Sequence, residues 1–578
     1  MHVSQLAVPF AISLIVAGCA SPAGTASGSP TGQARDGIVV QVPVIARPGG
    51  ESAEWWFRNG AAQAAARGAM QGRAKNIILF IGDGMSLTTV AAARILEGQR
   101  KGAPGEENRL SWEDFPDTAL SRTYNTNSQT PDSAGTASAM TTGVKTRLGV
   151  LGVGQQATRG DCAQGKAARL LTLWELAAAS GMATGVVTTT PVTDATPAST
   201  YAHTTERNWQ NDSDMPAAAL AAGCVDSARQ LIEAPPGRRP DVVMGGGRKD
   251  FMPITVHDPE YPDQMGERRD GRDLVAEWQQ RNPAGRYVWN ATQLAAAPSR
   301  GPLLALFEPD VMHYAHDRTR DAAGEPTLVE MTRAAITRLS RLSADQGAHG
   351  FVLMVEGGRI DHAHHAGNAY RALDETIALS DAVRVATEMT SIEDTLILVT
   401  ADHSHTLTFS GYPRRGNPIL GKVHGGSRES NATLEPAMLA RDAIGLPYTS
   451  LNYASGPGYA GATDQQPQGP KLLRKRPATI QPSIGGRPDL TDVDTENPDY
   501  LQEALIPMRS EAHGGDDVGI WAQGPGSSAV RGSVEQNTIF HFLLQATPRL
   551  RAALCAKGDC DANGVSVILP KPADFGME

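Results

Sequence analysis

Clusters of acidic residues and histidines occur at several places in the sequence, and most of them directly follow a short apolar run. These clusters lie in the segments "GDGM" (82–85), "VTDAT" (192–196), "EGGRIDHAHH" (356–365) and "ADHSH" (401–405). Asp361 and His365 are four residues apart, so on a helical turn both would lie on one face and could bind one metal ion. Mixed histidine and carboxylate ligands suit zinc, so we expect zinc at such a site. Asp83, Thr196 and Glu356 would form an all-oxygen site, which suits magnesium.

A serine follows an aspartate in the segment "QTPDSAGTASAMTTG" (129–143). The small residues after Ser133 predict a helix, whose N-terminus would favour a negatively charged group near the serine. Small side chains would also let such a group approach the backbone. A serine hydroxyl is a weak nucleophile unless a base or a metal activates it, so nearby metal sites would matter for Ser133.

The elements that position these residues are predicted from apolar runs of strand length. Such runs lie at 76–82, 185–190, 241–246, 351–358 and 395–405, and helical patterns such as residues 167–180 separate them. Apolar strands alternating with helices indicate an α/β fold with a doubly wound, mostly parallel sheet flanked by helices. Ligands of such sheets bind beyond the carboxyl ends of the strands. One acid after a strand is usually a turn or cap residue, but four such ends together indicate a shared site.

The length of 578 residues would by itself suggest about four domains. Because the candidate ligands are drawn from positions 83 to 403, we expect one large catalytic domain instead, formed by residues 51–406 and 511–578. Residues 407–510 are rich in Gly, Pro and polar residues and predict a crown-like insertion with little regular core. The apolar segment "VGIWA" (518–522) can rejoin the sheet after this insertion.

The N-terminus is typical of an exported protein. Residues 1–18 resemble a lipoprotein signal peptide that precedes Cys19, and residues 19–50 predict a flexible tether. A plain secretory signal with an incidental cysteine is the alternative. We expect an exported protein, anchored through lipid to a membrane and facing the periplasm or cell exterior. The net charge of −10, without a basic run, argues against nucleic-acid binding.

The remaining cysteines are Cys162, Cys224, Cys555 and Cys560. An even number in an exported chain favours disulfides, and four cysteines allow three pairings. Spacing indicates only that Cys555 and Cys560 could close a short loop. The sequence has no CxxC pair, so a cysteine zinc site is not expected.

A longer series of motifs resembles the alkaline phosphatase family. These motifs occur in family order: "LFIGDGM", "TPDSAGTASAMTTGVKT", "GVVTTT", "TYAHTTERNW", "VMGGGRKDF", "DPEYPD", "LFEP", "MVEGGRIDHAHH", "TADHSH", "GYPRRG" and "EAHGGDDV". The resemblance covers nearly the whole mature chain. It implies an enzyme that hydrolyses phosphate monoesters to an alcohol and inorganic phosphate, through a phosphoserine formed on Ser133.

The resemblance also implies a role for individual residues around two zinc ions and one magnesium ion. It assigns the first zinc to Asp361, His365 and His513, the second zinc to Asp83, Asp402 and His403, and magnesium to Asp83, Thr196 and Glu356. Arg207 corresponds to the arginine that binds phosphate, and Asp132 to the acid that orients it. His405 is similar to a residue that contacts Asp361.

A peripheral calcium site is a further implication of the resemblance. Glu260, Phe307 and Glu308 match ligands of the animal branch, with Phe307 providing its carbonyl oxygen. Glu325 stands at the place of the last ligand, although this chain has two extra residues before it.

The same family supplies three more expectations. Cys162 would pair with Cys224, and residues 54–70 would form an N-terminal helix that lies across the partner in a homodimer. This chain also combines the Asp194 of many bacterial members with the His362 of the animal branch.

Two other functions are compatible with parts of this pattern. One is a two-metal hydrolase of the same superfamily that acts on diesters, and the other is an inactive phosphate-binding lipoprotein. The all-oxygen site and Arg207 favour monoesters, and an inactive relative would be expected to lack Ser133 or a zinc ligand.

Overall fold

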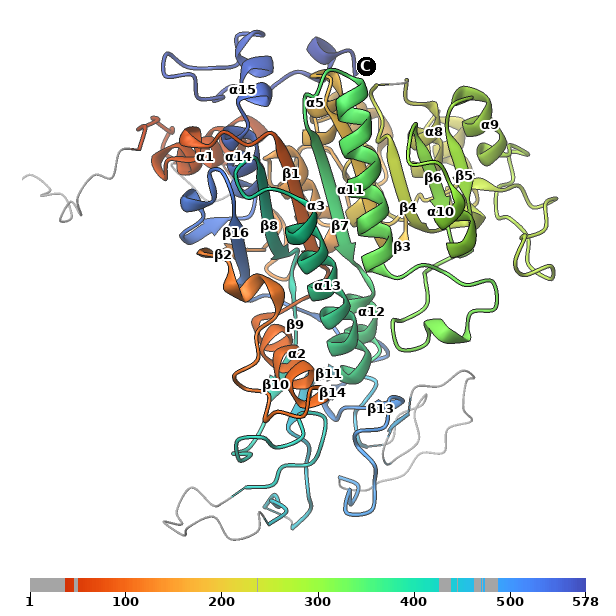
Figure 1. Cartoon of the computed structure of the whole chain (residues 1–578), viewed down its shortest axis with the longest axis vertical. Helices are drawn as coiled ribbons and strands as arrows, with labels where there is room; N and C mark the ends of the chain where they lie inside the picture. Colours follow the sequence, from red (N-terminus) through yellow and green to blue (C-terminus); the bar gives the residue numbers. More distant parts are fainter. Residues whose placement is uncertain are drawn as a thin grey trace, which may run out of the picture. The chain divides into compact units, whose positions relative to one another are not determined.

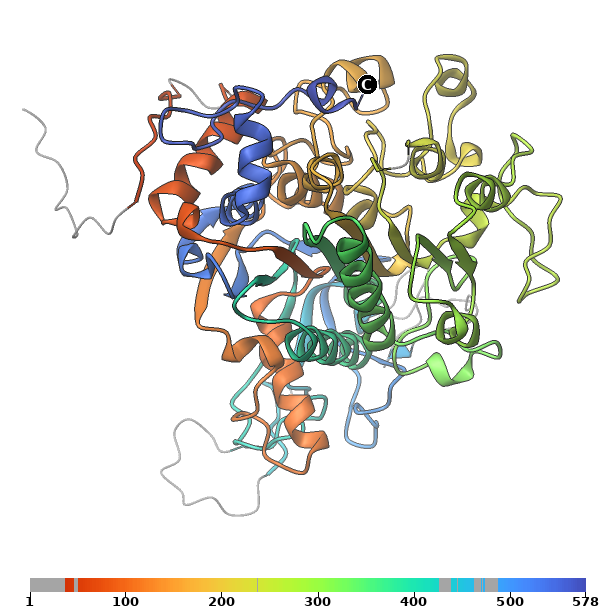
Figure 2. The same ribbon diagram turned by 45° about the horizontal axis from the view of Figure 1, so that its top comes forward.

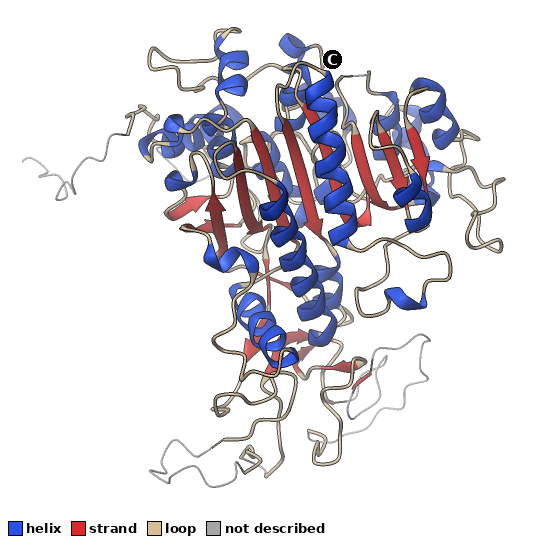
Figure 3. Ribbon diagram, in the orientation of Figure 1, coloured by secondary structure: helices blue, strands red, loops and turns tan. Residues whose placement is uncertain are grey.

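A mostly parallel sheet lies at the centre of the chain, and helices cover both of its faces (Figures 1 and 3). The computed structural model describes residues 37–45, 50–235, 237–425, 438–443, 445–461, 469, 471–472 and 487–577. The predicted signal peptide and Cys19 lie outside these residues, as does most of the tether. Within the described part, residues from 37 onward form one compact unit.

The sheet has ten strands among the described residues, in the order β17-β2-β16-β8-β1-β7-β3-β4-β6-β5. Their bounds are β1 Asn76–Gly82, β2 Asp117–Arg122, β3 Ala183–Pro191, β4 Val242–Gly246, β5 Arg286–Val288, β6 Leu303–Leu306, β7 Phe351–Gly357, β8 Thr395–Ala401, β16 Val518–Gln523 and β17 Gly532–Glu535. From β8 to β5 all neighbours are parallel, which confirms the predicted fold class. The segment predicted to rejoin the sheet does so as β16, antiparallel to β8 and β2.

Strand β1 shows why the central strands are apolar at every position. Ile77, Leu79 and Ile81 belong to one hydrophobic core, and Ile78 and Phe80 belong to the core on the opposite face. Successive side chains of a strand point to opposite faces, so a strand covered on both sides needs apolar residues throughout.

The two cores lie beneath different helices. One is covered by α2 (Leu87–Arg100), α11 (Leu328–Asp345) and α13 (Ala369–Met389), and Figure 2 shows α11 and α13 on the same face. The other is covered by α1 (Ala53–Ala66), α3 (Ser133–Thr142), α5 (Leu173–Ala179) and α14 (Thr538–Ala546). The shorter helices are α4 Cys162–Ala167, α6 Ala195–Ala198, α7 Ala217–Ala221, α8 Ser227–Glu233, α9 Leu274–Arg281, α10 Ala291–Ala296, α12 Arg359–His365 and α15 Pro548–Cys555.

The helix predicted over residues 167–180 is shorter in the structure. Helix α4 ends at Ala167, and the chain between the two helices runs extended because Leu170 N–H donates to the Gly152 carbonyl at 2.9 Å. Helix α5 then begins after Thr172, whose hydroxyl accepts from Glu175 N–H while the Glu175 carboxylate accepts from Thr172 N–H. This reciprocal capping box starts a new helix inside the apolar pattern.

The N-terminal helix ends before the predicted limit of residue 70. Gly68 adopts a left-handed φ of 88° after α1, and only a short 3₁₀ turn, Ala69–Gln71, follows it. Helix α1 packs on α14 of its own chain, where the Asn537 amide donates to the Trp56 carbonyl at 2.8 Å. No helix in the described part of the chain has both the length and the apolarity needed to cross a membrane.

The predicted insertion contains short strands in its described residues. Strands β10 (Leu407–Phe409), β11 (Leu451–Gly456) and β14 (Ala504–Pro507) form one small sheet, and β12 (Lys471–Leu472) pairs with β13 (Tyr500–Leu501). Strands β9 (Ser404–His405) and β15 (His513–Gly514) pair where the chain leaves the main sheet and returns to it. The boundaries proposed for the two domains stay a prediction.

Both expected disulfides are present. Cys162 is bonded to Cys224, and Cys555 is bonded to Cys560.

Candidate active site

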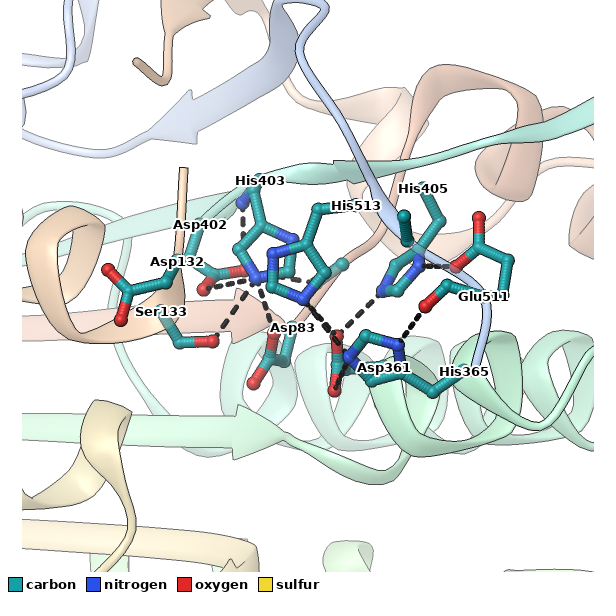
Figure 4. Close-up of polar contacts among 12 residues, drawn as sticks. Asp83, Asp132, Ser133, Asp361, His365, Asp402, His403, His405, Glu511 and His513 are labelled. Carbon is teal, nitrogen blue, oxygen red and sulfur yellow. Dashed lines mark hydrogen bonds and ion pairs between the residues drawn. The ribbon is translucent and has the colours of Figure 1, made fainter. Parts of the chain in front are cut away.

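The predicted ligands meet at the carboxyl ends of the central strands (Figure 4). Asp83 follows β1 and Asp402 follows β8, and the paired register of Gly82 with Ala401 brings these two acids level. Glu356 is the second-last residue of β7, which pairs with β1 on the other side. Parallel strands that end in register therefore deliver acids from distant parts of the sequence to one edge.

Asp361 lies at the centre of the first cluster. Helix α12 carries Asp361 and His365 on consecutive turns, and the distance from His365 Nε2 to Asp361 Oδ2 is 3.4 Å. His513 Nε2 lies 3.4 Å from Asp361 Oδ1 and 3.1 Å from His365 Nε2. His405 Nε2 is closer, at 2.6 Å from Asp361 Oδ1. Burial acts to raise the pKa of Asp361, but the surrounding histidines hold that pKa well below its ordinary value.

The second cluster includes the candidate nucleophile. His403 Nε2 lies 3.4 Å from Asp83 Oδ1, 3.3 Å from Asp402 Oδ2 and 3.1 Å from Ser133 Oγ. Asp402 is held in place by the backbone, because its Oδ1 accepts from Gly84 N–H at 3.0 Å. Burial and the neighbouring carboxylates of Asp402, Asp361 and Glu356 raise the pKa of Asp83 well above its ordinary value.

The oxygen-rich group lies beside these clusters. Glu356 is buried at the end of β7 and accepts from the Thr188 hydroxyl, while Thr196 lies on α6. Burial is the main cause that raises the pKa of Glu356, to about 8. Closely spaced buried carboxylates repel one another unless a cation or a proton compensates their charge.

The donor atoms fit bound metal ions. Asp83 Oδ1 and Thr196 Oγ1 are buried and have no hydrogen-bond partner in the described part of the chain, which is costly unless something else binds them. His365 Nε2 and His513 Nε2 face each other beside the Asp361 carboxylate, as the ligands of one metal ion do. The histidine–carboxylate clusters suit zinc, and the Asp83–Thr196–Glu356 oxygens suit magnesium.

A cationic side chain lies between two acids at the mouth of the site. Arg207 donates to Asp132 Oδ2 at 3.3 Å and to Asp194 Oδ1 at 3.2 Å. Asp132 is the N-cap of α3, since its carboxylate also accepts from Gly135 N–H at 3.1 Å, and Ser133 is the first residue of that helix. Burial acts to lower the pKa of Arg207, but Asp194 and Asp132 raise it above its ordinary value. The site thus combines the Ser133 hydroxyl, a helix N-terminus and a planar cation, which together match a phosphate group.

Comparisons with known proteins agree with this geometry. Residues 74–548 match the family model described as alkaline phosphatase. The tissue-nonspecific alkaline phosphatase of Gallus gallus is 43% identical over 484 residues, which cover 82% of this chain and 85% of that protein. The alkaline phosphatase of Gadus morhua is 42% identical over 481 residues, which cover 82% of this chain and 92% of that protein.

The chain belongs to the alkaline phosphatase family. Solved alkaline phosphatases share its fold. That of Thermus thermophilus has a TM-score of 0.56 at 23% identity, covering 83% of this chain and 92% of that one. The enzyme of the Antarctic bacterium TAB5 has a TM-score of 0.51 at 21% identity, covering 82% of this chain and 98% of that one. This alkaline phosphatase is therefore a phosphomonoester hydrolase.

The alkaline phosphatase site also includes residues that the sequence analysis does not assign. Arg359 Nη1 lies 2.8 Å from His362 Nδ1, and Glu511 contacts both His405 and His365. Glu511 lies in the quoted motif "EAHGGDDV", so an acid two residues before His513 was an available signal. Arg359 lies in the motif "MVEGGRIDHAHH", one helical turn before His362, and that spacing was also available.

Three of the expected calcium ligands, Glu260, Glu308 and Glu325, lie in two groups that share Glu308. Glu260 and Glu308 lie with Asp321, whose carboxylate the sequence analysis does not assign. Glu308 also lies with Glu325 and His313 in an adjoining group. Burial and the carboxylates of Asp321 and Glu308 raise the pKa of Glu260 to about 8. One oxygen of Glu260 is buried without a hydrogen-bond partner among the described residues, as expected for a cation ligand.

Proposed function

We propose that this alkaline phosphatase acts through a phosphoserine on Ser133, in a site that holds two zinc ions and one magnesium ion. The observation that carries the proposal is the position of Ser133 Oγ. It lies at the N-terminus of α3, only 3.1 Å from His403 Nε2, the nitrogen that also faces Asp83 and Asp402.

Arg207 and α3 would bind the phosphate of the substrate. The guanidinium can donate two parallel hydrogen bonds to phosphate oxygens, and Asp132 and Asp194 hold it in the required orientation. The free N–H groups at the start of α3 favour the negative charge of the same group. These residues would fix the phosphorus atom in line with Ser133 Oγ.

The proposed metal ligands are divided among the clusters described above. The first zinc would take Asp361, His365 and His513, the second zinc Asp83, Asp402 and His403, and magnesium Asp83, Thr196 and Glu356. When bound, such ions lower the pKa of the serine hydroxyl and of a water molecule and neutralise charge on the reacting oxygens.

Two displacements at phosphorus complete the proposed reaction. In the first, Ser133 Oγ loses its proton and forms a bond to phosphorus as the ester bond breaks, and the leaving oxygen takes up one proton in exchange and departs as the alcohol. In the second, water forms the new bond to phosphorus as the Ser133–phosphorus bond breaks, which releases inorganic phosphate and restores the hydroxyl. Arg207 stays on the phosphate oxygens throughout both steps.

Replacement of the nucleophile tests this proposal. Ser133→Ala is expected to remove nearly all turnover while the fold and the zinc content persist, because the serine oxygen is not needed to build the clusters. Acid-quenched enzyme should carry phosphate on the peptide that contains Ser133. Ser138→Ala is the matched control, since Ser138 lies on the same helix and its hydroxyl donates to the Val150 carbonyl and accepts from Gly152 N–H. Phosphate trapped on another residue would contradict the assignment.

Metal content and substrate range are tested together. Elemental analysis of the purified enzyme should give zinc and magnesium near a ratio of two to one. The same sample should release the alcohol from an aryl phosphate at alkaline pH much faster than from the matching diester. Equal rates on both esters would favour the alternative diesterase reading.

A calcium ion is proposed at Glu260, Glu308 and the Phe307 carbonyl. Because Asp321 and Glu325 both lie beside Glu308, either can supply the last carboxylate. Calcium binding followed by calorimetry should weaken strongly in Glu260→Gln. Asp321→Asn and Glu325→Gln are then compared, and the variant that also weakens calcium binding identifies the last ligand.

The remaining proposals concern assembly and location. We propose a homodimer and an exported lipoprotein that faces the periplasm or the cell exterior. Cys19 lies outside the described residues, so mass spectrometry of the mature N-terminus is the direct test. A mature chain that begins at an unmodified residue would exclude the lipid anchor.

A further inference from the structure

Glu511 is a buried acid that lies between β14 and β15 and has no role in the proposed reaction. Its side chain is fully enclosed, although it lies just beyond a loop segment with exposed residues. One carboxylate oxygen contacts His405 Nδ1. The other accepts from the Thr406 backbone N–H at 2.7 Å and from the Thr406 hydroxyl. Both oxygens are therefore engaged, which holds the carboxylate in one orientation.

The backbone of Glu511 contacts a second histidine. Its carbonyl oxygen lies 2.5 Å from His365 Nδ1, and its N–H donates to the His365 carbonyl at 2.9 Å. One residue thus engages the Nδ1 atoms of two histidines on different elements, α12 and β9 (Figure 4).

The contacts of Glu511 with Nδ1 of His365 and of His405 leave the Nε2 atom of each ring facing the Asp361 cluster. A neutral imidazole carries one ring proton, so Nδ1–H donating to an oxygen leaves the lone pair of Nε2 free. His365 Nε2 then faces His513 Nε2 at 3.1 Å, in the position of a metal ligand. His405 lies between two carboxylates, with Nε2 at 2.6 Å from Asp361, so the orientation of Asp361 depends on Glu511 through this ring.

We infer that Glu511 is a positioning residue for the site formed by Asp361, His365 and His513. The inference rests on the proposed function, because it assumes that this cluster binds zinc. Glu511 acts in two ways: its carbonyl sets the ring of His365, and its carboxylate sets Asp361 through His405. The partners of metal-bound histidines commonly contribute a factor of about 10 to 100 in metal affinity.

Zinc affinity is the measurement that separates positioning from a general effect on the fold. Glu511→Gln keeps the size of the side chain and one oxygen acceptor but offers an amide where His405 requires a carboxylate. We expect zinc affinity, measured by competition with a chelator, to fall about 10- to 100-fold at one of the two zinc sites. The visible spectrum of the cobalt-substituted protein should change at the same site. Added zinc should restore activity, and the melting temperature at saturating zinc should stay near that of the wild type.

Two variants serve as matched controls. Glu503→Gln makes the same chemical change in the insertion, where Glu503 binds Arg487 at 2.9 and 2.6 Å and has no histidine partner among the described residues. Thr406→Val removes one donor to Glu511 but leaves the contact with His405 intact. Both controls should keep zinc affinity near the wild-type value.

Each outcome decides between the readings. If Glu511→Gln keeps the zinc affinity of the wild type, the inference is wrong. It is also wrong if Glu511→Gln and Thr406→Val both lose zinc affinity equally at the two zinc sites, because that pattern indicates only a loop contact. Asp361→Asn tests the proposed function separately. If wild-type protein and Asp361→Asn bind zinc equally, the cluster itself is wrong and the failure does not belong to Glu511.

Discussion

The charges of His362 and Arg207 are expected to determine how tightly the enzyme binds phosphate. Arg207 binds Asp194, whose charge also acts to raise the pKa of His362. Burial and the nearby Arg359 outweigh that effect, and the pKa of His362 is lowered from its ordinary value. We therefore expect His362 to be uncharged at alkaline pH, and Arg207 to be the cation that binds phosphate there.

A lysine at position 362 should change this balance. The ordinary pKa of a lysine is about four units above that of a histidine, so under the same burial and the same Arg359 a lysine at position 362 stays charged to a much higher pH and adds a cation beside the phosphate site. We expect inhibition by inorganic phosphate to become roughly tenfold tighter, the effect of about 1.4 kcal/mol, and turnover to fall because product leaves more slowly. His362→Gln, which adds no charge, is the control. Phosphate inhibition constants that coincide for wild type and His362→Lys from pH 7 to 10 would contradict this prediction.

At the scale of elements, the turn after β1 brings the main sheet into contact with the histidines of the insertion boundary. Gly84 adopts a left-handed φ of 68°, and a Cβ atom there would lie 2.3 Å from His405 Cδ2 and 3.4 Å from Asp361 Cα. Its N–H donates to Asp402. This turn needs a glycine both for its backbone conformation and for the space that the ring of His405 occupies.

Gly84→Ala should therefore weaken zinc binding as well as stability. A left-handed backbone alone costs a residue with a side chain about 1 kcal/mol of stability. The clash with His405 would also displace the neighbouring Asp361, a proposed zinc ligand. Gly102→Ala separates these effects, because Gly102 has a φ of 82° but no atom within 4 Å of the added Cβ. Thermal unfolding should show a loss in both variants, whereas only Gly84→Ala should lose zinc. Equal zinc content in the two variants would contradict the packing argument.

At the scale of the whole molecule, stability in acid depends on groups buried without charge. His541 is fully buried on α14, where its ring packs edge-on against Phe57 of α1 with 4.6 Å between centroids. Burial lowers the pKa of His541 to about 3. The unfolded chain takes up a proton on this histidine near pH 6.5 and the folded chain does not, so stability falls as the pH decreases through this interval.

Removal of this histidine should flatten the acid limb of the stability profile. Between about pH 6 and pH 4, His541 contributes a loss of about 1.4 kcal/mol per pH unit, which His541→Gln should abolish. The measurement is the free energy of unfolding in urea at several pH values. His257→Gln is the control on an exposed loop and should keep the wild-type slope. Parallel profiles for wild type and His541→Gln would show that the buried ring does not cause acid sensitivity.

Assembly is a further property of the whole molecule. Helix α1 packs on its own chain, whereas the segment before it exposes apolar side chains such as Val39 and Val44. Partner contact is expected for this segment if the enzyme is a homodimer. Light scattering of the mature protein at micromolar concentration should give about twice the chain mass. A monomer at all concentrations would contradict the prediction.

Local patterns in the sequence determined the strands, the order of the ligand-type residues and the helix that begins at Ser133. Each depends on neighbours within a few residues: β1 is apolar at every position because both faces are covered, and Asp132 caps the helix that it precedes. These elements could therefore be predicted before any contact was known, whereas the resemblance to a known family supplied the division of the ligands among the clusters.

Only the tertiary structure decided which atoms meet. In "DHAHH", spacing alone does not separate His364 from His365, yet His364 turns to Thr89 and Tyr453 while His365 joins Asp361. The roles of Glu511 and Asp321 likewise depend on contacts across long stretches of chain, and such contacts are set by packing instead of local propensity. The break between α4 and α5 has the same cause, because the hydrogen bond that Leu170 N–H donates to the Gly152 carbonyl competes with the helical pattern there.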